Sequence, residues 1–520
     1  MYREDPEYGR IVDFDWLRTI HRRVADNFHP RFNMLGAVRT CIELTTSEPS
    51  VNIAIGASLL AYTLLIASDE DELAESLKDA IFTLAWTEEH CGSDLLSLRT
   101  HATPIAGDET GRQYHLRGSK WIINNSIHAD YHIVLAKLDP TQDGPRSLSF
   151  FLVPHSSTKN WQRMDTHVLR NMVLAAYEID GPGRLLGKVG HGLSIVQRMA
   201  TASRYLCSYM GVVWMRQSLP AAIEHLARKH IFGAHPLEFG NVFRQMYVLV
   251  QKAALLDYLF HRSVAFNDGS FLQFLGTMLK SWLLLRTNEV MIETLLVTGS
   301  KGFVSSSPIG RNAIDSLVLP VFDGHYTVNT NMSAKHLKRY LSAARRVDLR
   351  ERLRILDERL YYETYHEEIH AHPRDIRKPD FFDFADYLQQ FQLPLELDAR
   401  RLVATAQQVQ EAIIDRGQQN DPEHRYKAGD LLHWLESILV AAELSAHLGG
   451  DDYVNAVAIQ YNGTVELLNQ IIAESALPVD FMTPARFLPL PRVADPQAYL
   501  LRLLDVERRV LAKESSVSLN

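Results

Sequence analysis

The segment "WTEEHCGSD", residues 86–94, decides how this chain of 520 residues is interpreted. It follows the apolar run "AIFTLA" and gathers hydroxyls, carboxylates and a glycine where a β element is expected to leave the core. An ordinary surface turn would explain this composition. A ligand site would also explain it, because a glycine lets a ligand approach the backbone and a serine hydroxyl can bind a phosphate group.

A second segment, "RGSKWIINNSIHADYHIVLA" at residues 117–136, follows. Together the two segments resemble the acyl-CoA dehydrogenase superfamily of flavoproteins, which carries a T-E-x-x-x-G-S-D block, then a G-x-K-x-x-I-x-N block and A-D. The resemblance implies bound FAD, which needs hydrogen-bond donors along its diphosphate and pyrimidine edge and an apolar wall behind its ring. The alternative is an ordinary hairpin edge with a core tryptophan. The flavin-binding residues implied by the resemblance are Thr87, Gly92, Ser93, Trp121, Ile123 and Asn124.

A third segment, residues 295–337, resembles the glycine-rich turn and the catalytic loop of the same superfamily. Gly299 matches the first glycine of the turn, and Ser300 replaces the second. The segment "DGHYTV", residues 323–328, resembles the corresponding segment of acyl-CoA oxidases. Those proteins carry long helical C-terminal extensions. The resemblance places Asp323 where many members carry the catalytic glutamate, and it implies that His325 and Thr327 contact the cofactor.

Asp323 is therefore predicted to be the catalytic base. Removing the weakly acidic α-proton of a thioester requires a desolvated carboxylate, and burial raises the pKa of a carboxyl group toward the working pH. Some relatives place the base on a bundle helix, at a position that Ser203 occupies here. Nitroalkane oxidases of this superfamily pair a loop aspartate with an arginine, at a position that Thr330 occupies here. The alternative role for Asp323 is a turn residue or a helix N-cap.

Arg228 and Lys229 are predicted to bind the flavin diphosphate of a neighbouring subunit, because a family arginine with that role aligns with Lys229. A lysine serves a phosphate as a point charge, without the two-pronged contact of arginine. A family glutamine further along aligns with Gly240. The resemblance thus implies a homodimer or homotetramer, with a hetero-oligomer as the alternative.

The order of expected elements gives the fold class. Helical periodicity is expected before and after a central region of short segments rich in aromatic and β-branched residues, bounded by turn signals. A helix is expected over residues 72–85, "ELAESLKDAIFTLA", directly before that region. We predict an α+β fold like that of acyl-CoA dehydrogenases, with a shortened N-terminal helical domain (1–86), a middle antiparallel β-barrel or sandwich (87–188), a helical bundle (189–345) and an acidic helical C-terminal extension (346–520).

Composition restricts the class of protein. The net charge of −8, with acidic residues in excess after residue 346, argues against a nucleic-acid partner. The three cysteines are too far apart to suggest a disulfide framework or a cysteine-based zinc site. The polar N-terminus is unlike a signal peptide, and no apolar run approaches the ~20 residues of a membrane span. A cytoplasmic protein is expected.

One competing motif is "HEEIH", His366–His370, which matches the H-E-x-x-H signature of zinc peptidases. On a helix the two imidazoles would share a face. The polar flanks and the proline at residue 373 favour a solvated helix face instead, so no metal is predicted.

The sequence predicts an FAD-dependent oxidoreductase that carries out α,β-dehydrogenation of an acyl thioester, acting on a CH–CH group. The acyl carrier is CoA or an acyl-carrier protein, and the electron acceptor is oxygen or an electron-transfer flavoprotein. Two alternatives stay open: a catalytically degenerate subunit that completes a partner's site, and a member that oxidises a non-thioester substrate of the nitroalkane type.

Overall fold

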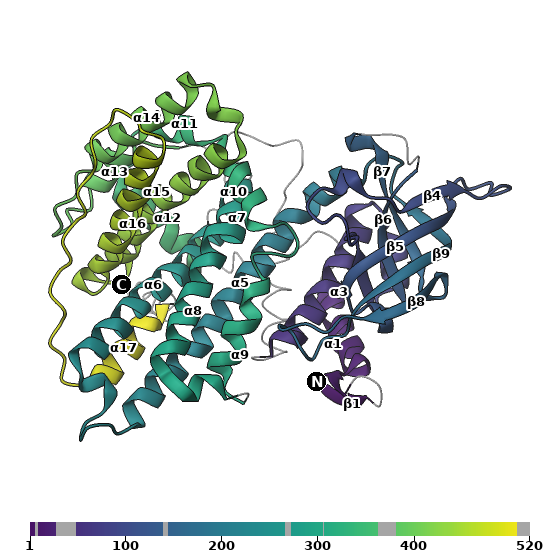
Figure 1. Ribbon diagram of the computed structural model, residues 1–520, viewed down its shortest axis with the longest axis horizontal. Coiled ribbons are helices and arrows are strands. Elements are labelled where there is room, and N and C mark those ends of the chain that lie inside the picture. Colours follow the sequence, from purple (N-terminus) through teal and green to yellow (C-terminus); the bar gives the residue numbers. More distant parts are fainter. Residues whose placement is uncertain are drawn as a thin grey trace. The chain divides into compact units, whose positions relative to one another are not determined.

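The computed structural model describes residues 1–5, 9–27, 48–138, 144–265, 272–304, 306–361 and 381–506. These residues form two compact units (Figure 1). The first unit contains Met1–Leu206 and the second contains the described residues from Cys207 onward. The boundary lies inside one long helix, α5 (Gly192–Arg228), which belongs to the predicted helical bundle of residues 189–345.

The first unit contains a closed β-sheet. Seven strands have the order β3-β6-β4-β5-β9-β7, with β8 on β9, and β6 also pairs with β7, which closes the sheet into a barrel. β1 and β2 form a separate antiparallel pair. The strands are β1 (Tyr2–Asp5), β2 (Gly9–Val12), β3 (Phe82–Ala85), β4 (His101–Pro104), β5 (Gln113–Asn124), β6 (Tyr131–Lys137), β7 (Leu148–Pro154), β8 (Thr158–Arg163) and β9 (Leu174–Leu186).

The barrel differs from the sequence prediction at its first strand. The helix predicted over residues 72–85 ends early as α4 (Asp71–Ser76), and β3 joins the sheet parallel to β6, with Phe82 opposite Tyr131. A strand that is buried on both faces shows no alternation of polar and apolar residues, so its sequence resembles that of a buried helix. The sheet is therefore mostly, and not wholly, antiparallel.

The helices of the first unit are α1 (Phe14–Asn27), α3 (Pro49–Ala67), α4 and the first part of α5. α3 packs against β3, and the Phe82 N–H donates to Ser58 Oγ at 3.1 Å. α3 is long and apolar enough to cross a membrane, which corrects the expectation that no run approaches this length. However, 83% of that window is buried, as in a core helix.

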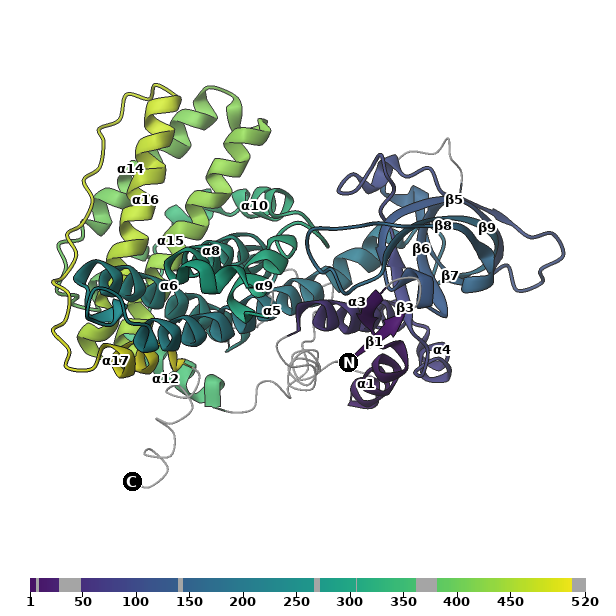
Figure 2. The same ribbon diagram turned by 60° about the horizontal axis from the view of Figure 1, so that its bottom comes forward.

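The second unit is helical (Figure 2). A π-helical turn, Leu279–Leu283, joins two of its helices, α7 and α8. Besides the rest of α5, the helices are α6 (Gly240–Ala265), α7 (Leu272–Met278), α8 (Leu284–Thr298), α9 (Pro308–Asp315), α10 (Tyr326–Ala334), α11 (Leu337–Leu341), α12 (Leu349–Tyr361), α13 (Phe384–Gln389), α14 (Ala399–Asp415), α15 (Pro422–Leu448), α16 (Val454–Glu474) and α17 (Pro496–Leu504).

Buried charges join the C-terminal extension to the bundle. Arg262 of α6 lies 2.9 Å from Glu436 and also contacts Glu443, both on α15. Glu443 accepts further hydrogen bonds from Arg352 Nε at 2.8 Å and the Tyr387 hydroxyl at 3.0 Å. Buried charges are tolerated only when they are paired and hydrogen-bonded, so this network fixes how α15 packs on α6.

Candidate functional site

A buried ion pair joins the two motif segments of the first unit. Lys120 Nζ lies 3.0 Å from Glu88 Oε1, and both side chains are almost fully buried. The same ammonium group donates to the carbonyls of Leu135 at 3.0 Å and Trp86 at 3.2 Å. Lys120 thus binds the start of the 86–94 segment to β5 and β6.

Glu88 in turn holds the chain that follows its own segment. Its carboxylate accepts hydrogen bonds from the backbone N–H groups of Arg99 at 2.8 Å and Thr100 at 3.0 Å and from the Thr100 hydroxyl at 2.6 Å. Burial alone would raise the pKa of Glu88, but Lys120 and these donors outweigh it and lower the pKa. Gly118 allows this packing, because a Cβ there would lie 2.7 Å from the Thr100 Cα.

The second motif segment bends outward after Lys120. The Trp121 N–H donates to the Thr87 carbonyl at 3.0 Å, and the β5–β9 register shifts between Lys120 and Ile123. Ile122 has a φ of 54° and is exposed. The Ile123 side chain lies in the barrel core, so only its backbone is available to a ligand, whereas Trp121 is half-buried.

Asn124 and Asn125 end this segment. Asn124 is half-buried, and its carbonyl accepts a hydrogen bond from the Thr83 hydroxyl at 2.6 Å. Asn125 is buried with a φ of 56°, and its side chain donates to the Ala54 carbonyl of α3 at 2.7 Å. Asparagine tolerates this left-handed conformation better than most residues. The sequence motif contained Asn125 without indicating that it anchors α3.

The 88–94 loop presents small polar groups outward. A pair of 3.0 Å backbone hydrogen bonds between Glu88 and Cys91 forms its turn, and Gly92 and Ser93 are exposed. A Cβ at Gly92 would meet nothing within 4 Å, so packing inside the chain does not require glycine there. A free backbone approach at Gly92 and the hydroxyl of Ser93 fit a ligand with phosphates.

A metal ion fits this loop less well. Ligand atoms of Glu88, His90 and Cys91 lie within 4.8 Å of one another. The Glu88 carboxylate already binds Lys120 and three hydrogen-bond donors, and a cation would have to compete with that ammonium group. The zinc-peptidase motif His366–His370 lies outside the described residues.

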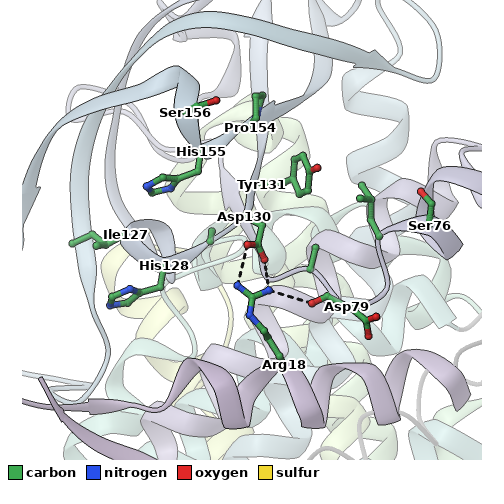
Figure 3. Close-up of a pocket in the computed structure, with 13 residues that line it drawn as sticks. Arg18, Ser76, Asp79, Ile127, His128, Asp130, Tyr131, Pro154, His155 and Ser156 are labelled. Atoms are coloured by element: carbon green, nitrogen blue, oxygen red, sulfur yellow. Dashed lines mark hydrogen bonds and ion pairs between the residues drawn. The ribbon is translucent and has the colours of Figure 1, made fainter.

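The A-D pair of the second motif, Ala129 and Asp130, lines a separate pocket of the first unit (Figure 3). Arg18 of α1 makes a two-pronged ion pair with Asp130, and one of its hydrogen bonds measures 2.9 Å. Arg18 also donates to the Asp79 carbonyl at 3.2 Å, and Asp130 accepts from the Ile81 N–H at 2.8 Å. Asp130 therefore joins α1 to the barrel.

In the second unit, Asp323 lies at the tip of a tightly held loop. The Tyr326 N–H donates to the Pro320 carbonyl at 2.8 Å and closes the loop. Lys280, in the π-helical turn, donates to the Phe322 carbonyl at 2.7 Å, and the buried Asn329 donates to the Gly324 carbonyl at 2.8 Å. The carbonyls on both sides of Asp323 are thus fixed by side chains.

Asp323 itself is half-buried and has a φ of 53°, followed by Gly324 with a φ of 93°. The N-cap of α10 is His325 and not Asp323, since the His325 ring accepts from the Thr327 N–H at 3.3 Å and contacts the Thr327 hydroxyl at 2.8 Å. Burial and then Lys280 lower the pKa of His325, which favours the neutral ring that such a cap requires. His325 and Thr327 therefore bond each other beside Asp323.

The predicted cationic residues form a second cluster in this unit. Arg228 and Lys229 are exposed at the end of α5. Burial lowers the pKa of His225 in α5, and Lys229 and Lys301 lower it further; Lys301 belongs to the turn that contains Gly299 and Ser300.

Two features of this cluster were not predicted. Phe232 is 96% exposed and has a φ of 49°, which is unusual for a bulky residue. The 299–303 turn packs closely on α9, because a Cβ at Gly310 would lie 2.0 Å from the Gly302 carbonyl oxygen. In the sequence, the glycine after Phe232 indicates a tight turn at this point. In the structure, Gly233 also has a positive φ.

Comparison with known proteins agrees with these motifs. Residues 83–179 match the acyl-CoA dehydrogenase middle domain, and residues 190–338 match the acyl-CoA dehydrogenase C-terminal domain. Cyclohex-1-ene-1-carbonyl-CoA dehydrogenase of Geobacter metallireducens is 25% identical over 49% of this chain and 67% of its own length. Glutaryl-CoA dehydrogenase of Desulfococcus multivorans is 28% identical over 43% of this chain and 60% of its own length.

Solved structures share the fold at low identity. An acyl-CoA dehydrogenase of Bacillus anthracis complexed with FAD has a TM-score of 0.68 and 16% identity, covering 96% of this chain and 90% of its own. Butyryl-CoA dehydrogenase of Megasphaera elsdenii has a TM-score of 0.56 and 17% identity, covering 63% of this chain and 91% of its own. The first of these extends the shared fold to almost the whole chain.

Proposed function

We propose that this protein is an FAD-dependent oxidoreductase that introduces an α,β double bond into an acyl thioester, because residues 83–179 and 190–338 match the middle and C-terminal domains of acyl-CoA dehydrogenases. The observation that carries the proposal is the junction of the two flavin motifs. The buried Glu88–Lys120 pair and the Trp121–Thr87 hydrogen bond hold both motif segments side by side. FAD complexes among structures of the same fold support the choice of cofactor.

The residues proposed to hold FAD are those that face outward from this junction. Ser93 offers a hydroxyl, Gly92 an open backbone, and Trp121 and Asn124 a half-buried aromatic face and an amide. When bound, FAD would supply the acceptor for the two electrons that leave the substrate as a hydride. The protein's part is to orient the ring and to exclude water from it.

Asp323 is proposed to accept the α-proton of the thioester. The carbonyls on both sides of it are anchored by Lys280 and Asn329, so its backbone is fixed before substrate binds. A positioned base contributes typically 10²–10⁴-fold to rate, and displacement of about 1 Å can cost roughly 10²-fold. Thr330 carries no charge and its hydroxyl donates to the Tyr326 carbonyl at 3.0 Å inside α10, so it does not supply the arginine of a nitroalkane-type site.

Arg228, Lys229 and Phe232 are proposed to contact the FAD of a second copy of the chain. A cation beside a projecting aromatic ring suits a diphosphate joined to a planar base. Dimers or tetramers follow from this arrangement. CoA is the proposed acyl carrier, since the matched relatives named above act on CoA thioesters by their names.

The test is anaerobic reduction of the purified protein by a panel of acyl-CoA thioesters and the same acyl groups on an acyl-carrier protein. A yellow protein that retains FAD and is bleached by at least one thioester supports the proposal. A protein that stays colourless after incubation with FAD would favour the degenerate-subunit alternative. A protein that binds FAD, is reduced by dithionite and ignores every thioester would refute the substrate class.

A further inference from the structure

Three asparagines of α16 bind the backbone of an extended segment. Residues 478–495, here called the strap, connect α16 to α17 without helix or strand (Figure 1). Each asparagine side chain both donates to and accepts from one strap residue. The pairs, with donor distance first, are Asn469 with Met482 (2.9 and 2.8 Å), Asn462 with Ala485 (3.1 and 2.7 Å) and Asn455 with Leu488 (3.4 and 2.8 Å).

The spacing of these pairs matches two periodicities. The asparagines are seven residues apart, which is about 10.5 Å along an α-helix. Their partners are three residues apart, which is roughly 9–10 Å along an extended or polyproline-type chain. The strap runs antiparallel to α16, so successive asparagines meet successive turns of the strap. The match explains why three pairs form without a break.

Few side chains of the strap are buried. Met482 and Ala485 are buried and Leu488 is half-buried, so they form the inward face, whereas Phe481 and Phe487 are 60% and 53% exposed. Two large apolar side chains therefore contribute little burial. An amide that pairs with both backbone groups of a residue recognises the main chain and not the side chain.

The strap leads to a docked helix. Tyr499 of α17 stacks near Tyr247 of α6, the Tyr453 hydroxyl donates to the Leu503 carbonyl at 2.8 Å, and Arg502 lies 2.7 Å from Asp452. Asn455, besides holding Leu488, lies 3.3 Å from the Tyr247 hydroxyl. The asparagine contacts thus continue directly into the surface that receives α17.

We propose that Asn455, Asn462 and Asn469 form a binding site for an extended peptide backbone, and that the strap of this same chain is its ligand and latches α17 onto α6. The site is independent of the proposed oxidoreductase activity. Compact domains rarely contain connections of this length without secondary structure. The asparagines supply hydrogen-bond partners for strap backbone groups that would otherwise bind water. The latch opens locally, without unfolding of α16.

Amide hydrogen exchange of the full-length protein tests the contact pattern. Met482, Ala485 and Leu488 donate their N–H groups to asparagine oxygens, so these three amides should exchange at least tenfold more slowly than those of Thr483, Arg486 and Phe487. Uniformly fast exchange along the strap would overturn the proposal.

Trypsin cleavage after the exposed Arg486 tests the latch itself. Asn462→Leu removes two hydrogen bonds and should speed cleavage on the order of tenfold. Gln470→Leu is the matched control, because Gln470 lies on the same helix and pairs with Glu474 instead of the strap. Ala485→Pro removes one strap N–H and leaves α16 unchanged, so it should also speed cleavage. Equal cleavage rates in Asn462→Leu and Gln470→Leu, with the helix content unchanged, would refute the latch.

Discussion

Replacing Lys120 by methionine should loosen both flavin motifs at once. The substitution keeps the length of the side chain and removes the cation 3.0 Å from Glu88. Breaking a buried ion pair by removing one partner costs about 3–5 kcal/mol. The three hydrogen-bond donors to Glu88 remain in the variant, so we expect a loss of stability at the low end of this range, about 3 kcal/mol. This loss corresponds to roughly a 10²-fold rise in the equilibrium constant for local opening.

Hydrogen exchange followed by mass spectrometry measures this opening in peptides that cover residues 86–94 and 117–125. Lys159→Met is the matched control, since Lys159 pairs with Asp180 at 2.6 Å but is half exposed, and such pairs are worth about 0–1 kcal/mol. Adding Glu88→Gln to Lys120→Met should recover at least about 1 kcal/mol, because no unpaired buried charge remains. Equal protection in Lys120→Met and Lys159→Met would refute the reasoning.

The pH dependence of protection in the same peptides should weaken in Lys120→Met. In the wild type the pKa of Glu88 is lowered on folding, so its stabilising effect is complete above its unfolded pKa, about 4.3, and is lost as the pH falls through the folded value. Without Lys120, the largest cause that lowers the pKa of Glu88 is lost, so this pKa should rise relative to the wild type. Protection in Lys120→Met should therefore fall less than in the wild type as the pH is lowered.

Further expected results concern the second unit. Asp323→Asn should leave FAD bound and slow flavin reduction by about 10²–10⁴-fold in stopped-flow bleaching, and an unchanged rate would remove Asp323 from catalysis. Lys280→Met frees the Phe322 carbonyl, so it should lower kcat more than it raises KM, and a change in KM alone would contradict a positioning role. Lys229→Ala and Phe232→Ala should weaken FAD retention measured by ultrafiltration while the FAD-free protein keeps its melting temperature; full retention in both would remove this cluster from the cofactor site.

The predicted fold class is confirmed, and the predicted resemblance to acyl-CoA dehydrogenases agrees with the two matched domains. Periodicity located four of the strands, whereas β8 was not predicted. β5, β6, β7 and β9 contain aromatic and β-branched residues between turn signals, which is a local property. β3 was mistaken for helix because a fully buried strand lacks alternation. Lys120 and Glu88 both belong to the recognised motifs, but spacing along the chain cannot show that two residues 32 positions apart form an ion pair.

The extension illustrates why contacts over long separations escape prediction. Gly429 looks unfavourable in the helix α15, yet a Cβ there would lie 2.0 Å from the Thr330 carbonyl oxygen of α10. On the same face, His433 hydrogen-bonds Ser333 at 2.8 Å, and Ser333 bonds Thr277 of α7 at 2.8 Å. α10 begins directly after the loop that carries Asp323. The close crossing at Gly429 therefore makes the extension part of the support of that loop, which the composition of the extension could not indicate.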